Sequence, residues 1–173
     1  MAIVGILLSI AIPNFMARRP GYERKQFIDH LNALIQVAWQ NAVVTHKLHR
    51  ITFDTSKRIV SIEMQSMSRK SATGENIFEP MTSRYLNSTY QWPEDTFEIK
   101  NFFVNKRDEY NLSLGYSGKG KIWFYIVPEG LAQPVIINMY DIKNVQGGRP
   151  AEFSLVLNPF LAQFKEYDTF QKP

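Results

Sequence analysis

The sequence contains no cysteine among its 173 residues. This absence excludes a disulfide framework, a thiol nucleophile and a cysteine-ligated zinc site. The chain also has little excess of either charge: it contains 20 lysine and arginine residues and 16 aspartate and glutamate residues, which gives a formal net charge of +4. That excess alone is too small to indicate a nucleic-acid partner. Hydrophobic residues make up 45% of the chain, which is typical of one folded domain with a core of its own.

The chain opens with an uncharged apolar run that extends from Ala2 to Ile12 and stops at Pro13. As a helix this run would be roughly 17 Å long, shorter than the ~30 Å hydrocarbon core of a bilayer. A cleavable secretory signal fits poorly, because no basic residue precedes the run. A core helix is the alternative, but the run is apolar on every face. We therefore expect that the run is part of a longer membrane segment and that Met1 lies partway along this segment. A basic cluster follows it, made of Arg18, Arg19, Arg24 and Lys25.

A second helix is predicted from about residue 22 to residue 47. Proline and glycine at Pro20-Gly21 predict a break or kink before it. Apolar residues then recur with the three-four spacing of one helix face. They are Phe27, Ile28, Leu31, Leu34, Ile35, Ala38, Trp39 and Ala42. We expect this stripe to lie against a sheet, with Trp39 in the core; a groove for a partner is the less favoured alternative.

Beyond residue 47 the pattern indicates strands. Residues 48–54 and 58–64 flank a short turn and predict an antiparallel hairpin. The continuously apolar segment 122–127 predicts a central strand buried on both faces. The polar segment 66–93 has no clear period and is expected to be a long, partly ordered excursion. Segment 163–170 leaves a strand and a short helix open. Further strands are expected at 96–104, 135–140 and 153–157.

One helix followed by antiparallel strands predicts an α+β fold. The N-terminal wording, Ala-Ile-Val-Gly-Ile-Leu from Ala2 and Ala-Ile-Pro-Asn-Phe up to Phe15, resembles the second half of the N-terminal helix of type IV pilins and type II secretion pseudopilins. Three further features resemble the GspH/FimT group of minor pseudopilins: a hairpin with Ile51–Asp54 near the end of the helix, a strand pair from Phe124–Gly130 into Val135–Asn138, and a closing strand near the C-terminus. The resemblance implies a pilin-like fold, a long N-terminal helix packed on an antiparallel β-sheet head.

The resemblance also implies a domain organisation. Residues 1–19 would form an N-terminal helix for the membrane and the filament core, and residues 20–173 a pilin-like globular domain. Within that domain, the amphipathic helix covers about 22–47 and the β-rich head about 48–173. Family members carry a basic leader, a glycine cleavage site and a glutamate beyond it. None of these is present in the sequence, so we expect that Met1 is not the true start.

The function that the resemblance implies is that of a minor pseudopilin, a structural subunit of a type II secretion pseudopilus and not an enzyme. It would be a single-pass inner-membrane protein with its globular domain in the periplasm. Its partners would be other pseudopilins or pilins through the N-terminal helix, and partner subunits or secreted cargo at the head. No cofactor or metal is expected. The residues expected to anchor the chain and pack the filament are Ile3, Ile6, Leu7, Ile10 and Pro13.

A FimT-like minor type IV pilin, which takes part in pilus assembly or DNA uptake, is the alternative function. The DNA-binding residues would then be Lys119 and Lys121, with Trp123 beside them. Phosphate binding needs clustered cations, and aromatic residues help to bind single strands. The cationic clusters in this chain are short, so DNA is not expected as a partner.

Two motifs suggest enzyme or metal chemistry and are rejected. Gly115 to Lys121 matches the start of a phosphate-binding loop, but Ile122 replaces the hydroxyl residue that would hold magnesium. A strand is predicted to follow, whereas a phosphate site needs a helix N-terminus there. His46 and His49 are three residues apart, but they fall between a helix and a strand with no cysteine to assist, so solvated histidines are favoured.

Overall fold

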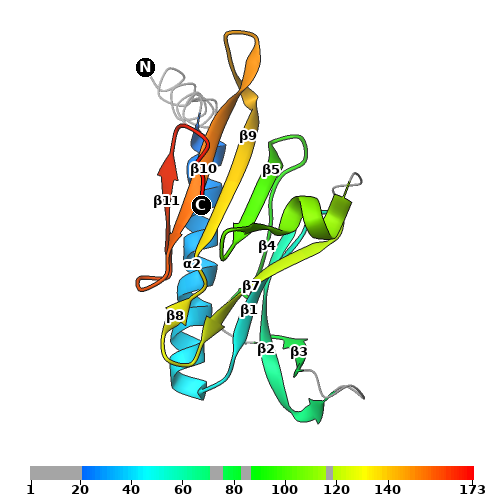
Figure 1. Cartoon of the computed structure of the whole chain (residues 1–173), viewed down its shortest axis with the longest axis vertical. Coiled ribbons are helices and arrows are strands. Elements are labelled where there is room, and N and C mark those ends of the chain that lie inside the picture. Colours follow the sequence, from blue (N-terminus) through cyan, green and yellow to red (C-terminus); the bar gives the residue numbers. More distant parts are fainter. Residues whose placement is uncertain (1–20, 71–75, 83–86, 116–118) are drawn as a thin grey trace, which may run out of the picture.

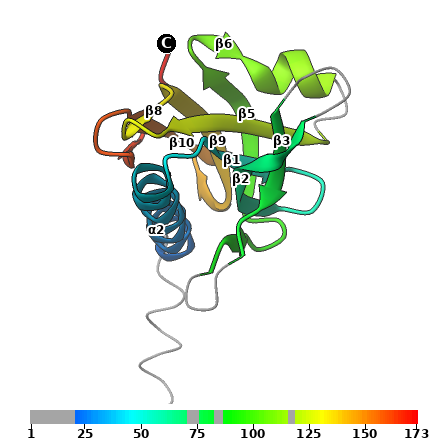
Figure 2. The ribbon, with the colours of Figure 1, turned by 90° about the horizontal axis from the view of Figure 1, so that it is seen from below.

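The computed structural model describes residues 21–70, 76–82, 87–115 and 119–173 (Figure 1). One long helix, α2 (Tyr22–Thr45), runs beside two antiparallel sheets. Figure 2 looks roughly along α2 and shows it on one side of the strands. The predicted α+β class is present, with one difference: the strands form two sheets where a single head sheet was expected.

Helix α2 begins and ends at residues in the left-handed conformation. Gly21 precedes it with a φ of 83°, a conformation that glycine adopts at little cost. This is the break that the Pro20-Gly21 pair predicts, although Pro20 lies outside the described residues. At the other end His46 has a φ of 52°, so the helix ends at Thr45, two residues before the expected end. The buried residues of its apolar stripe are Phe27, Ile28, Leu31, Leu34, Ile35, Ala38 and Ala42.

The prediction for Trp39 is wrong in part. Its side chain is only partly buried and packs against the margin of the core. The indole Nε1 donates a hydrogen bond of 2.7 Å to the carbonyl oxygen of Gly130. An indole N–H needs an acceptor when it is withdrawn from water, and this turn carbonyl supplies one at the edge of the helix face.

The first sheet has six strands, and five of them follow the order β3-β2-β1-β7-β8, while β4 pairs with β2. They are β1 (His49–Asp54), β2 (Ile59–Lys70), β3 (Asn76–Pro80), β4 (Thr89–Gln91), β7 (Lys121–Val127) and β8 (Leu131–Ala132). The predicted hairpin is confirmed, with Ile51 opposite Ile62. The excursion predicted for 66–93 is wrong, because β2 continues to Lys70 and both β3 and β4 pair with β2.

Strand β7 is present where the sequence predicts a strand, but it is not buried on both faces. Ile122, Phe124 and Ile126 are buried and face α2's side of the sheet. The alternate residues are exposed or half-buried, with Trp123 40% exposed. Two of these outward residues are aromatic, and for this reason the segment looks continuously apolar in the sequence.

The second sheet has the order β11-β10-β9-β5-β6. Its strands are β5 (Phe97–Val104), β6 (Arg107–Asp108), β9 (Val135–Gln146), β10 (Arg149–Asn158) and β11 (Gln163–Tyr167). The segment that the sequence left open, 163–170, therefore contains a strand. A short π-helix, η1 (Tyr110–Leu114), follows β6.

Aromatic side chains join α2 and the two sheets into one core. The ring centroid of Phe27 lies 6.1 Å from that of Trp92, which follows β4, and 5.0 Å from that of Phe97 on β5. Phe53 of the first sheet meets Phe102 of the second at 5.1 Å. All three elements therefore share one hydrophobic cluster, and α2 holds both sheets.

The burial of Leu31 tests this core. Leu31 is fully buried at 0% exposure, whereas Val44 on the same helix is 77% exposed. Leu31→Ala should lower the free energy of unfolding by about 2–5 kcal/mol, since it removes packed methyl groups and leaves a cavity. Val44→Ala is the matched control and should change it by less than about 0.5 kcal/mol. Denaturant melts measure both; a loss under about 1 kcal/mol for Leu31→Ala would place the stripe at the surface.

His49 gives the fold a dependence on pH. It is buried, and its Nδ1 donates to the carbonyl oxygen of Lys47 at 2.9 Å. Burial, helped by the charge of Lys47, lowers the pKa of His49 below 6.5, although the hydrogen bond opposes this. The unfolded chain then takes up a proton that the folded chain resists. The free energy of unfolding should fall below about pH 6.5, by at most about 1.4 kcal/mol per pH unit. Melts of His49→Gln should show a flatter dependence; an equal slope in both proteins would contradict this assignment.

Candidate partner-binding face

The residues predicted to anchor the chain are not placed by the structure. Ile3, Ile6, Leu7, Ile10 and Pro13 lie outside the described residues, and their role stays a prediction. Within the described ranges, no helix combines the length and the apolarity that a membrane crossing needs. Helix α2 is long enough at 24 residues, but one of its faces is polar.

The predicted cationic residues lie at the start of β7, beside the turn that joins β1 to β2. The N–H of Thr55 donates to the carbonyl oxygen of Gly120 at 2.9 Å, and Gly120 returns a bond of 2.9 Å to the Thr55 hydroxyl. Lys119 and Lys121 are exposed on either side of Gly120. Asp54 lies opposite Lys121 in the pairing of β1 and β7, so a carboxylate stands next to this lysine.

The two enzyme-like motifs do not come together as sites in the described part of the chain. Gly115 follows η1, and the strand β7 begins at Lys121, so no helix N-terminus follows the glycines. His46 is exposed at the end of α2, whereas His49 is buried in the core. No group of three or more histidine, aspartate or glutamate residues that could hold a metal is found among the described residues.

An arginine stacked between aromatic rings marks the outer face of the first sheet. The guanidinium carbon of Arg50 lies 4.3 Å from the ring centroid of Phe78 and 5.1 Å from that of Trp123. The same guanidinium forms a salt bridge with Glu63, which also accepts a bond of 3.1 Å from the Thr52 hydroxyl. We call Arg50, Phe78, Trp123 and Tyr125 the aromatic face. These contacts fix the position of the Arg50 guanidinium between the rings.

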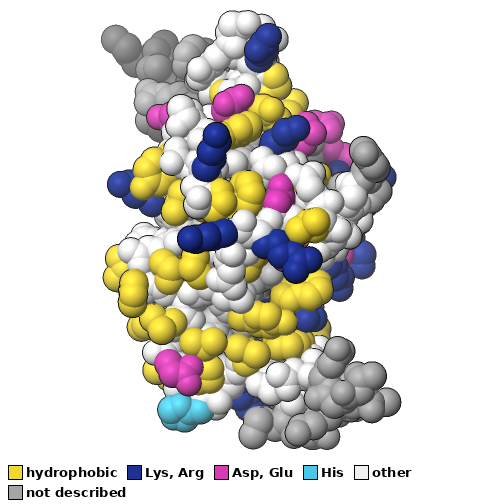
Figure 3. Space-filling view, in the orientation of Figure 1, with side chains coloured by type: hydrophobic (Ala, Val, Ile, Leu, Met, Phe, Trp, Pro, Cys, Tyr) yellow, Lys and Arg dark blue, Asp and Glu magenta, His cyan; other side chains and the backbone are white. Residues whose placement is uncertain are grey.

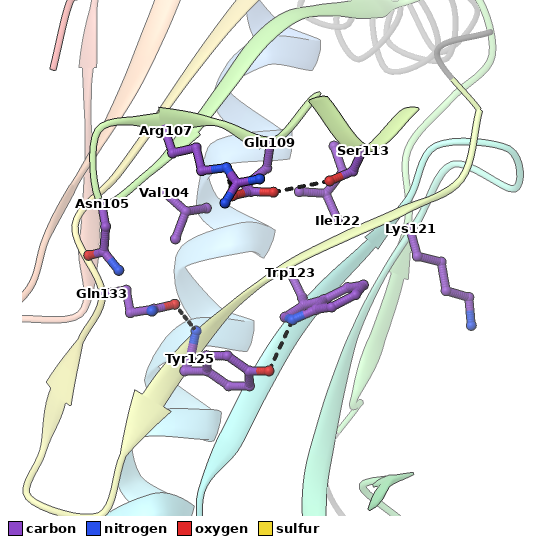
Figure 4. A pocket seen from close by; sticks show the side chains of 10 residues that line it. All are labelled: Val104, Asn105, Arg107, Glu109, Ser113, Lys121, Ile122, Trp123, Tyr125 and Gln133. Carbon is purple, nitrogen blue, oxygen red and sulfur yellow. Dashed lines mark hydrogen bonds and ion pairs between the residues drawn. The ribbon is translucent and has the colours of Figure 1, made fainter. Parts of the chain in front are cut away.

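A groove of about 430 Å³ lies beside β7 (Figure 4), within the range of roughly 300–1,000 Å³ that is usual for binding clefts. Its floor and rim come from β5, β6, η1 and β7, and its lining residues are Val104, Asn105, Arg107, Glu109, Ser113, Lys121, Ile122, Trp123, Tyr125 and Gln133. Figure 4 shows Arg107, Glu109 and Ser113 on one wall, facing β7 with Trp123 and Tyr125. The aromatic face therefore continues into this groove.

Asp108 shapes the wall opposite β7. It accepts hydrogen bonds from the side chains of Asn101 and Asn111 and from the backbone N–H groups of Phe102 and Asn111. Burial disfavours the charged form, but these four bonds outweigh it and hold the pKa of Asp108 below its ordinary value of 3.8. A charged Asp108 thus fixes the turn between β5 and η1, which carries Arg107 and Glu109.

The groove is lined by two cationic side chains, Arg107 and Lys121, and by one anionic side chain, Glu109. Arg107 Nε lies 3.3 Å from Glu109 Oε1, and Ser113 Oγ donates to Glu109 Oε2 at 3.0 Å. The arginine side chain is 68% exposed and the glutamate side chain 27%, so the cation is the more accessible member of this pair. Sequence reasoning singled out Lys121 and Trp123 here but missed Arg50, Phe78 and Arg107. Strand parity, which puts Arg50 and Trp123 on one sheet face, is the signal that could have found part of this set.

A second exposed surface is apolar. Phe160 and Leu161, in the turn between β10 and β11, are 72% and 62% exposed, and Leu131 of β8 is 41% exposed. A hydrogen bond of 2.9 Å from the N–H of Ala132 to the carbonyl oxygen of Pro159 holds the two segments together. In Figure 3, apolar side chains gather at this place, at the lower left of the molecule.

Comparison with known proteins gives a likeness in structure. No family model matches the sequence, and no curated protein is similar to it in sequence. Two solved structures of the minor pseudopilin EpsH, from the type II secretion system of Vibrio cholerae, are similar, with TM-scores of 0.54 and 0.55 and 8% sequence identity. The likeness covers 84% and 87% of this chain and 97% of each EpsH chain. At that identity it shows the fold alone: this chain has a pseudopilin-like fold.

Proposed function

We propose that this chain is a minor pseudopilin, a membrane-anchored structural subunit of a type II secretion pseudopilus. One observation carries the proposal: the fold is similar to that of two solved EpsH chains over 97% of their length, and EpsH is a minor pseudopilin of such a system. The sequence of the N-terminal apolar run supports the same role. This resemblance is one of sequence and does not depend on the fold of the described residues. The more specific placement in the GspH/FimT group is part of the proposal.

The described residues explain how an anchored helix would carry the head. Arg24 Nε lies 2.7 Å from Glu166 Oε1 of β11, and Lys143 Nζ lies 3.0 Å from Glu23 Oε2. Both ion pairs join the first turn of α2 to the second sheet. A force on the segment before α2 would therefore be transmitted to the second sheet through these two ion pairs. Arg24, predicted in the basic cluster next to the apolar run, faces the head and is engaged there.

The anchor itself is the apolar run that precedes α2. In this proposal Ile3, Ile6, Leu7, Ile10 and Pro13 hold the chain in the inner membrane as a single-pass segment, with the head in the periplasm. The same residues would later pack among the N-terminal helices of other pseudopilins. An uncharged helix can make that transfer because the core of such a filament is nearly as apolar as lipid.

The anchor can be tested by fractionation. The full chain should sediment with membranes and require detergent for release, whereas a chain shortened to residues 21–173 should be released without detergent. Leu7→Asp should weaken membrane retention, because a carboxylate at the centre of a membrane helix costs about 2.5–3.5 kcal/mol. Leu7→Ala is the matched control and should leave retention nearly unchanged.

Crosslinking of the intact membranes should join the full chain to other proteins with pilin-type N-terminal helices, identified by mass spectrometry. A full chain that is wholly soluble without detergent, or crosslinks without any such protein, would contradict the proposed function.

A FimT-like minor type IV pilin that takes part in DNA uptake is the second candidate. The observation in its favour is the contact of Gly120 with Thr55, which brings Lys119 and Lys121 next to the turn that carries Lys57. So few cations neutralise few phosphates, and such binding should vanish near physiological salt. DNA binding that persists at physiological salt, and is lost when Lys119 and Lys121 are replaced by glutamine, would favour this candidate over the pseudopilin.

A further inference from the structure

Strand β7 has an open edge. Its partner on that side, β8, is only two residues long and pairs Ala132 with Ile126 and Leu131 with Val127. The next residues, Gln133 and Pro134, are not paired with β7 as strand residues. The chain turns away there, and the carbonyl oxygen of Pro134 accepts a bond of 3.0 Å from the N–H of Asn105.

The hydrogen bonds of Tyr125 reveal which backbone groups of β7 face this edge. Its N–H donates to Gln133 Oε1 at 2.9 Å, and its carbonyl oxygen accepts from the N–H of Gln133 at 3.0 Å. Backbone groups alternate in direction along an antiparallel strand. Those of Trp123 and Lys121, two and four residues earlier, therefore point to the same side, whereas Ile122 and Phe124 bond to β1.

These edge groups have no backbone partner in the described part of the chain. β7 pairs with β8 only at its last two residues, so two N–H donors and two carbonyl acceptors of Lys121 and Trp123 border the groove. An exposed strand edge is a template for another strand, and natural proteins usually cover or blunt it. Here a cleft runs along the edge.

The surroundings of the edge indicate what would bind there. Trp123, Tyr125 and Arg50 belong to the residue types that dominate protein interfaces. Arg107 supplies the exposed positive charge on the opposite wall, and Lys121 extends outward at one end of the groove (Figure 4). A polypeptide in extended conformation offers the alternating donors and acceptors that this edge needs, which a nucleic-acid backbone does not.

We infer that the open edge of β7 binds an extended acidic segment of a partner polypeptide, which adds a strand in line with β8 along Lys121–Trp123. The inference rests on the proposed function in one respect, namely that the segment belongs to another subunit of the assembly. Backbone hydrogen bonds to the edge would provide affinity, and Arg107, Lys121 and Trp123 would select acidic and apolar side chains. A lysine on an edge strand can instead act only to repel other strands, and the test separates these roles.

The probe is a hexapeptide of alternating glutamate and valine, acetylated and amidated at its ends and carrying a fluorescent label. It is titrated against the full chain in detergent, with anisotropy as the readout. We expect saturable binding. A peptide with the same side chains but N-methylated backbone amides should bind more than about tenfold more weakly, because it cannot donate to the edge. The lysine–valine peptide should also bind more weakly.

Two substitutions at Lys121 separate charge from backbone. Lys121→Thr removes the charge and keeps the N–H. Lys121→Pro removes the N–H as well. This N–H takes no part in the ladder with β1. Proline is tolerated at this position because it is the first residue of the strand. The proline variant should bind the probe about tenfold more weakly than the threonine variant, at equal thermal stability.

A second pair of variants keeps the test decisive if the proline variant does not fold. Arg107→Glu should weaken binding of the acidic probe about fivefold. Arg149→Glu, an equal change of charge in the distant β9–β10 hairpin, should leave it unchanged. Equal binding of the methylated peptide, or equal effects of the two arginine variants, would overturn the inference. Failure here would leave the fractionation and crosslinking results intact, because neither depends on the groove.

Discussion

The burial of one helix face against two sheets is the constraint on which the rest of this structure depends. A helix of this length is marginal in water by itself, and packing supplies most of its stability. Leu31 and Ile35 are fully buried, and Ala38 and Ala42 on the same face are small enough to let strands approach closely. The two sheets share no strand, so α2 and the aromatic cluster hold their inner faces together.

Burial of the inner face determines what the outer face can be. Side chains alternate along a strand, so committing Ile122, Phe124 and Ile126 to the core commits Trp123 and Tyr125 to the opposite face. The same alternation directs the backbone groups of Lys121 and Trp123 away from β1. Strand β8 is only two residues long, and the chain then turns to the second sheet, where Pro134 accepts a bond from Asn105, so that edge has no strand neighbour along Lys121 and Trp123. The candidate interface is therefore a consequence of core packing and of the short strand β8, and no residue type alone would reveal it.

Much of the fold could be predicted from local patterns of residues in the sequence. The three-four spacing of apolar residues predicted α2, and the Pro20-Gly21 pair marked its start. The hairpin of β1 and β2 was equally visible, because both of its strands have strong strand propensity and a turn lies between them. Strands β3 and β4 were missed because they are short and mostly exposed, so they carry no buried alternation. The division into two sheets depends on pairings between distant segments, which local propensity does not encode.

The candidate site was visible only in part. Lys119, Lys121 and Trp123 were noticed as a small cationic cluster, and the structure shows that Lys121 and Trp123 are alternate residues of the strand β7. Arg50, Phe78 and Gln133 come from three other segments, and only the fold brings them to β7. The residues predicted to anchor the chain lie outside the described residues, so the interpretation of that segment rests on its wording and on the fold that follows it.

The central claim is that one edge of β7 is open, because a partner polypeptide would bind there. Amide hydrogen exchange of the full chain in detergent tests this claim most directly. The N–H groups of Ile122 and Phe124 pair with β1, whereas those of Lys121 and Trp123 face the groove. We expect the first pair to exchange at least about a hundredfold more slowly than the second, followed residue by residue by NMR. Equal protection of all four amides would show that the edge is already covered and would contradict the account.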